Sequence, residues 1–252
     1  IKETDYLPKS TLYKEDSYGT YKDKNDGKYS KNYTNVTVSN RYLNREARFY
    51  NTVFFNGRQW PVTCKQVQFY NGGNAGVQEG QATTTGYMLF KRFNRSISKT
   101  SPGVASQNRP SIIFRLADFY LIYAEVANEV LTYLNLVRER AGLPKVEILN
   151  PGIVGNKELQ RAAIQRERQI ELATEGQRYF DVRRWMIADK DGEGRQNGYA
   201  HGMNVRGTIN DTEEFNRVVE TEKIVFNRKM YLQPIPDHEM RKTQNLVQNP
   251  GW

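Results

Sequence analysis

The stretch that decides the fold reads ELATEGQRYFDVRRW and runs from Glu171 to Trp185. It closes a periodic segment that predicts a helix over 157–175, and it opens a short helix over 181–188. The apolar face of the longer helix also carries Glu167. A charge on such a face is costly unless it is paired, so the pattern predicts a buried ion network that fixes helix packing.

The members of this network come from the same stretch and from the helices before it. They are expected to be Glu167, Glu171, Arg178 and Asp181, bonded to one another, to backbone, or to Arg115 or Arg138. The alternative is an acid/base pair of a glycoside hydrolase, built from carboxylates at helical spacing. Such enzymes place their carboxylates on opposite sides of a substrate and not along one helix. We therefore assign no catalytic residue and expect the protein not to be an enzyme.

The residues before this stretch carry a second helical pattern. From 111 to 141 the chain has no Gly or Pro, which read literally gives one helix of ~45 Å. That is about twice the usual length, so we predict two antiparallel helices that turn near Glu129, with turn residues missing from the sequence there. Gly142 suits the end of the second helix. The first helix has one periodic face, which runs through Ile113, Leu116, Tyr120, Tyr123 and Ala127.

The flanking regions indicate loops and short strands. Residues 1–110 form a loop- and β-rich part, in which 48–55 has strand composition and the Asn56–Gly57 turn predicts a hairpin with 59–62. After the helical part at 111–188, residues 189–252 form a loop and terminal segment. They include an expected strand at 223–232, after which Asp237 is expected to cap a last helical turn. The predicted fold is mainly α, with irregular loops and short β-hairpins.

Composition excludes several kinds of site. The formal charge of +9 comes from Lys and Arg interleaved with acidic residues, so nucleic acid is not an expected partner. A single cysteine, Cys64, excludes an intrachain disulfide and a four-cysteine zinc site. His201 and His238 lie in different segments without neighbours at ligand spacing, and no phosphate-binding glycine loop is visible. We expect no metal and no cofactor.

Four segments in order resemble one family. The stretch at 171–185 resembles the ELAFEGHRFFDLRRW segment of SusD/RagB proteins. Residues 44–50 (NREARFY) resemble its NRDPRFY segment, and 115–125 (RLADFYLIYAE) its RLAEVYLIYAEA helix. The YLQPIP and QNPGW segments near the end resemble its LlPIP and QNPGY ending.

The resemblance implies a SusD-like fold, an α-α superhelix of tetratricopeptide-like helix pairs. Residues 1–252 would be the carboxyl-terminal half, with the amino-terminal half and its lipidated cysteine absent from this chain. The implied function is glycan binding on the extracellular face of the outer membrane, beside a SusC-like TonB-dependent transporter. A peptide-binding RagB-like role and a glycoside hydrolase-like enzyme are the alternatives.

Three aromatic residues are candidates for sugar stacking. Trp60, Tyr70 and Tyr87 lie in Gly- and Asn-rich loops, where flat rings could meet the apolar C–H faces of a sugar. For any single one of them, packing in the β-rich layer is the expected alternative. Trp185 is expected in the core.

Overall fold

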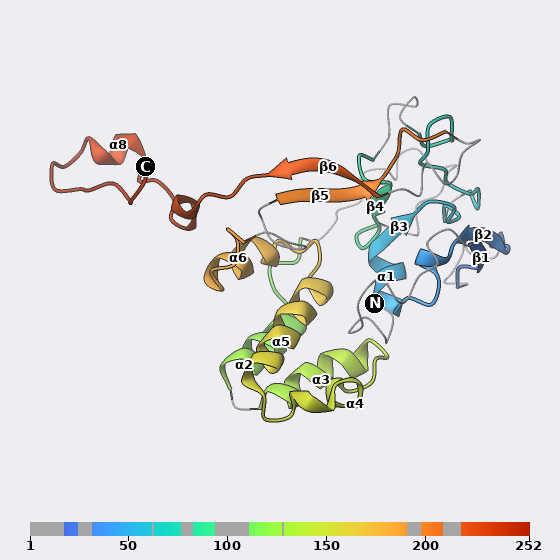
Figure 1. The fold of residues 1–252 in the computed structure, drawn as a ribbon, viewed down its shortest axis with the longest axis horizontal. Helices are drawn as coiled ribbons and strands as arrows, with labels where there is room; N and C mark the ends of the chain where they lie inside the picture. Colours follow the sequence, from blue (N-terminus) through green and yellow to red (C-terminus); the bar gives the residue numbers. More distant parts are fainter. Residues whose placement is uncertain are drawn as a thin grey trace.

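The computed structural model describes residues 18–24, 32–61, 63–76, 83–93, 111–127, 129–190, 198–208 and 218–252. In Figure 1 the helical body lies at the bottom and the loop- and β-rich part at the right. An extended terminal arm runs to the left. Over the described ranges the fold is mainly helical with three two-stranded antiparallel sheets, which confirms the predicted class. In the same ranges, no helix combines the length and apolarity that crossing a bilayer requires.

The bounds of the elements follow. The helices are α1 (Ala47–Thr52), α2 (Leu116–Val126), α3 (Val130–Arg140), α4 (Val146–Leu149), α5 (Lys157–Glu171), α6 (Gln177–Arg184) and α8 (Asp237–Met240). The 3-10 turns are η3 (Asn40–Tyr42), η6 (Pro151–Ile153) and η7 (Arg228–Tyr231). The strands are β1 (Tyr18–Tyr21), β2 (Val36–Ser39), β3 (Val53–Phe55), β4 (Tyr87–Leu89), β5 (Gly198–Met203) and β6 (Val218–Ile224).

The predicted helical hairpin is confirmed. Helix α2 ends at Val126 and α3 begins at Val130, and the two helices pack against each other. The ring of Tyr133 lies 4.6 Å from that of Tyr123 and 5.8 Å from that of Tyr120, so the chain folds back on itself. The expectation that turn residues are missing here stays a prediction.

Helix α2 is apolar on two faces. Ala117, Leu121 and Ala124 are buried, and the first two join the core between α2, α3 and α5. Of the face that the sequence indicated, Tyr120 packs on this core, whereas Leu116 and Tyr123 are 62% and 49% exposed. Periodicity alone could not show which face is covered, because apolar residues lie on both.

The helix at 157–175 also ends earlier than predicted. Helix α5 stops at Glu171, and a turn follows in which Thr174 and Gly176 have positive φ. The side chains of Lys91 and Arg115 donate to the Glu171 carbonyl at 2.9 and 2.7 Å. Carbonyls at a helix end need partners outside the helix, and here distant cations supply them.

The end of α3 follows the prediction. Gly142 has φ +74, and its N–H donates to the Glu139 carbonyl at 2.9 Å. The Leu143 N–H reaches the Arg138 carbonyl at the same distance. These two bonds form a Schellman motif, which favours glycine at this position.

The predicted strand at 48–55 is wrong in its first half. Residues Ala47–Thr52 form α1, and only Val53–Phe55 are extended, as β3. Strand β3 pairs with β4 and not with 59–62, with Phe54 opposite Met88. Helical backbone in α1 lets Arg48 reach α5, a tertiary contact that outweighs the strand composition.

The terminal segment holds a hairpin that the sequence did not indicate. Strands β5 and β6 pair antiparallel, and the expected strand at 223–232 begins earlier and ends at Ile224. Residues 228–231 form the turn η7 instead. The expected cap at Asp237 is wrong, because Pro236 occupies the cap position and Asp237 is the first residue of α8. Beyond β6 the chain runs away from the helical body as an arm, shown in red in Figure 1. The arm closes on itself where the Trp252 indole N–H donates to the Lys229 and Leu232 carbonyls.

Candidate functional site

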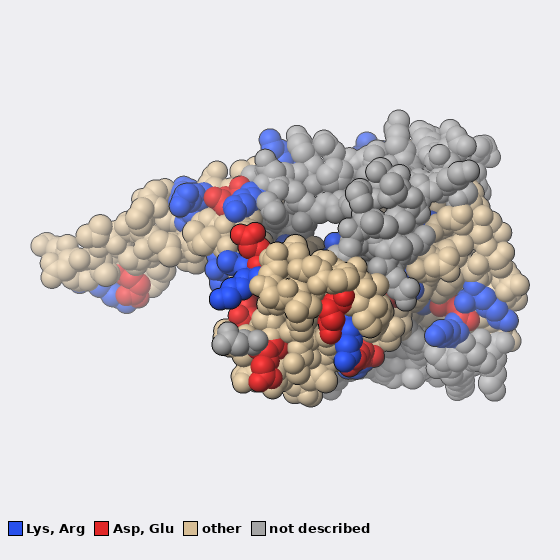
Figure 2. Space-filling view, turned by 60° about the horizontal axis from the view of Figure 1, so that its bottom comes forward, with Lys and Arg blue, Asp and Glu red and all other residues tan. Residues whose placement is uncertain are grey.

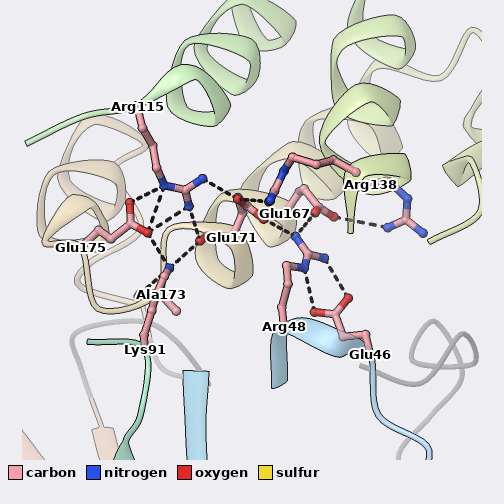
Figure 3. A network of polar contacts seen from close by, with 10 residues as sticks. Glu46, Arg48, Lys91, Arg115, Arg138, Glu167, Glu171, Ala173 and Glu175 are labelled. Atoms are coloured by element: carbon pink, nitrogen blue, oxygen red, sulfur yellow. Dashed lines mark hydrogen bonds and ion pairs between the residues drawn. The ribbon is translucent and has the colours of Figure 1, made fainter. Parts of the chain in front are cut away.

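A charged network surrounds α5 (Figure 3). Glu167 and Glu171 lie one turn apart on α5, and Glu175 follows in the turn after it; all three are at most 7% exposed. Arg48 of α1 donates to Glu167 at 2.6 Å and to Glu171 at 2.8 Å. Its other nitrogens bind Glu46. The loop- and β-rich part is thereby tied to the helical part.

Each of these carboxylates meets more than one cation. Glu171 Oε1 also accepts from Arg115 and Arg140, both at 2.6 Å. Arg115 binds Glu175 as well, at 2.9 Å, and Lys91 Nζ lies 2.5 Å from the same carboxylate.

Both predicted partners are confirmed, since Arg115 binds Glu171 and Arg138 donates to Glu167 at 3.3 Å. Asp181 and Arg178 were expected in the same network, but Asp181 binds Arg168 and Arg178 lies over the Trp185 ring. Arg48, Arg140 and Lys91 were not predicted as partners, because no spacing along the sequence relates them to α5.

The surroundings of Glu171 and Glu175 favour their ionised forms. Burial alone would raise the pKa of Glu171, yet hydrogen bonds from Arg48 and Arg115 outweigh it and hold the pKa below its usual value. Burial likewise opposes ionisation of Glu175, and bonds from Arg115 and Lys91 lower its pKa. A general acid in a glycosidase needs a raised pKa. The geometry therefore fits a structural network better than an acid/base pair.

A second buried network joins α2, α5 and α6. Arg168 donates to Asp118 at 2.7 Å and to Asp181 at 2.8 Å. Arg184 binds Asp181 and makes a two-pronged pair with Glu125, with both bonds at 2.6 Å.

Trp185 extends this second network, since its indole N–H also donates to Glu125. Trp185 is 5% exposed, in agreement with its predicted place in the core. The guanidinium of Arg178 lies 5.9 Å from the Trp185 ring centroid. Asp181, Arg184 and Trp185 of the motif thus serve helix packing.

The three predicted stacking residues lie together. Trp60, Tyr70 and Tyr87 all belong to or pack on one cluster with Phe54 and Phe90. The Trp60 ring is 5.2 Å from Phe54, and Tyr70 is 7% exposed. Part of each aromatic surface is thus used in packing the β-rich layer. Their role in stacking on a sugar stays a prediction.

A pocket of about 760 Å³ lies between the end of α6 and the arm. Its walls are Arg183, Arg184, Met186, Arg228, Lys229, Tyr231, Leu232, Pro250 and Gly251. The volume is within the ~300–1,000 Å³ of small-molecule sites. Sequence reasoning missed this pocket, although the two basic pairs at 183–184 and 228–229 were a visible signal.

The described residues offer no metal site. Nowhere in the described ranges do three His, Cys, Asp or Glu side chains gather so that they could hold an ion. His238 lies on α8, 3.0 Å from Glu239. Cys64 lies in the loop after Trp60, where its half-buried thiol is 4.0 Å from the Pro61 carbonyl.

Comparisons with known proteins agree on one family. The model of the SusD family matches residues 5–252. "SusD-like protein P25" of Formosa agariphila is 43% identical over 105 residues, which are 39% of this chain and 19% of that protein.

Solved structures are similar over a larger share of the chain. The protein BT4246 superposes with a TM-score of 0.67 at 28% identity, over 83% of this chain and 37% of its own. A SusD-like protein (BF3747) from Bacteroides fragilis gives a TM-score of 0.63 at 28% identity, over 84% and 40%. The chain therefore spans less than half the length of these relatives.

Proposed function

Because the chain belongs to the SusD family, we propose that the intact protein captures an oligosaccharide at the cell surface and delivers it to a SusC-like TonB-dependent transporter. The observation that carries this proposal is the family match over 5–252, which includes the four ordered motifs. A fold hosts many functions, so the capture role is an inference by analogy from the family. The proposed location is the outer face of the outer membrane, with a lipid anchor in the amino-terminal part.

The exposed apolar face of α2 supports the proposal that this chain is part of a larger domain. Leu116, Phe119 and Val126 are 62%, 54% and 77% exposed, and Phe180 of α6 is 63% exposed. A helix that is apolar all round is normally buried on both sides. We propose that residues 1–252 are the carboxyl-terminal half of one SusD-like domain and that the amino-terminal helices cover this face.

The ion pairs of the buried carboxylates favour a binding protein over a glycoside hydrolase. The acidic residues nearest to a glycosidase pair are Glu167, Glu171 and Glu175, and each is bonded to cations of the same chain. Figure 2 shows acidic and basic side chains side by side over the described part of one face. Such a surface does not resemble the single-sign stripe of a nucleic-acid-binding protein.

Recovery of the native protein from outer membranes tests the proposal. Mild solubilisation and affinity capture should recover a large β-barrel transporter together with the protein, and a glycan array should show binding. Recovery without such a barrel, together with no binding to glycans or peptides, would contradict the proposal. Binding to peptides alone, with the transporter present, would assign the RagB-like alternative.

A further inference from the structure

The pocket between α6 and the arm is held in shape by its own small core. Phe226 and Val182 are buried there with Ala188, and Tyr231 packs on them. The Tyr231 ring lies 4.9 Å from that of Phe226, and its hydroxyl donates to Asp189 at 2.5 Å. The turn η7, which carries Arg228 and Lys229, is therefore fixed against the end of α6.

The cations of the pocket have different environments. Arg184 is bound by Glu125 and Asp181, so its charge is already balanced. The guanidinium of Arg183 lies 3.4 Å from the Tyr179 ring centroid and 5.0 Å from that of Phe226. The pocket rim carries two further cations, Arg228 and Lys229.

Arg228 and Lys229 form a basic rim. Arg228 is exposed and interacts electrostatically with Asp189, which also accepts a hydrogen bond from the Tyr231 hydroxyl. Lys229 is half-buried, with its Nζ 4.2 Å from the Trp252 ring centroid. Among the described residues that line the pocket, none is acidic. A guanidinium and an ammonium in this position favour an anionic group.

The remaining walls are apolar or aromatic. Tyr231 and Leu232 come from the η7 segment, Met186 follows α6, and Pro250 belongs to the chain end. Leu232 and Met186 are 52% and 49% exposed. A ligand that fits both kinds of wall carries an anionic group on a body with apolar C–H faces.

We propose that this pocket binds an acidic sugar unit, with a carboxylate or sulfate at Arg228 and Lys229 and the sugar ring against Tyr231 and Leu232. The proposal rests on the proposed function, because it names the ligand class that the captured oligosaccharide would contain. A sugar is favoured over an acidic peptide because the pocket walls carry an aromatic ring and aliphatic side chains, whereas peptides added to a protein are commonly held by an open strand edge. The pocket is formed by side chains of a helix end and a 3-10 turn.

The test is calorimetry on the full-length protein with three probes: trigalacturonate, the neutral galactotriose, and a triglutamate peptide. Trigalacturonate should bind at least about tenfold more tightly than either of the others. Changing Arg228→Ala and Lys229→Ala together should weaken this binding about tenfold, and raising the salt concentration should weaken it as well. The charge-keeping pair Arg228→Lys and Lys229→Arg should retain most of the affinity.

The matched control removes two cations elsewhere on the same arm. Arg241→Ala with Lys242→Ala, on exposed positions next to α8, should leave trigalacturonate binding unchanged. Equal affinity for the acidic and neutral sugars, equal loss in both double variants, or tighter binding of the peptide would overturn the proposal. If neutral glycans bind and the transporter is recovered while Arg228→Ala has no effect, only the pocket assignment fails. Absence of both the transporter and all binding would instead overturn the proposed function.

Discussion

Arg48 of α1 donates a 2.8 Å hydrogen bond to Glu171 of α5, across 123 residues of sequence. Arg115 and Arg140 reach the other oxygen of the same carboxylate from two further segments. The buried Glu171 carboxylate thus joins the loop- and β-rich part to the start of α2 and to the end of α3. Removing one partner of such a buried pair leaves the other charge unpaired and lowers the stability of the fold.

Glu171→Ala is expected to lower the free energy of unfolding by about 3 kcal/mol, because Arg48 and Arg115 then remain largely buried without this partner. Denaturant unfolding of the full-length protein measures the change. The control is Glu239→Ala, whose carboxylate forms exposed pairs on α8 and should cost below about 1 kcal/mol. Equal, small losses in both variants would show that the network contributes little to stability.

Stability should fall on acidification through the carboxylates of Glu171 and Glu175. Their pKa values in the folded protein lie below the usual 4.5, so they stabilise the fold fully above that pH. The stabilisation should be lost as the pH falls through the lowered values, since protonation then breaks the pairs. Unfolding measured from pH 6 downward checks this, with Glu171→Gln and Glu175→Gln together giving a flatter profile. An unchanged profile in that variant would contradict the assignment.

The valine at the end of α2 provides a test of the covering amino-terminal half. Val126 and Val154 are 77% and 64% exposed here. In the full-length protein, Val126→Asp should cost about 2 kcal/mol or more, because a charge would be buried against the covering helices. Val154→Asp lies outside this face and should change stability by less than about 0.5 kcal/mol. Thermal unfolding of both variants measures the difference. Equal, small losses of stability would contradict the proposal that amino-terminal helices cover this face of α2.

The aromatic cluster allows packing and ligand stacking to be separated. Trp60→Leu keeps an apolar side chain beside Phe54 but removes the flat ring. If Trp60 stacks on the ligand, glycan affinity should fall about tenfold while the protein remains folded. Affinity electrophoresis in a glycan gel measures the first and thermal unfolding the second. Unchanged glycan binding would leave Trp60 with a packing role alone.

Local chemistry in the sequence was sufficient for several elements. Gly142 predicted the end of α3, because a left-handed residue after a helix favours glycine. The excessive length of the periodic segment at 111–141 predicted the hairpin, since the number of residues fixes the length of a helix. Charges on the apolar face of α5 predicted a buried network, because an unpaired buried charge is too costly to keep. The four ordered motifs predicted the family.

Tertiary structure decided what local patterns left open. The strand-like residues before Val53 became α1, since that conformation takes Arg48 to Glu167 and Glu171. The buried side of α2 was settled by where α3 and α5 lie, since both of its faces are apolar. The pocket with Arg228 and Lys229 exists only because the turn η7, at the base of the arm, packs against the end of α6. A sequence pattern predicts that a residue is buried, paired with a charge or placed in a turn. Which residue it contacts is decided by the packing of segments that are far apart in the chain.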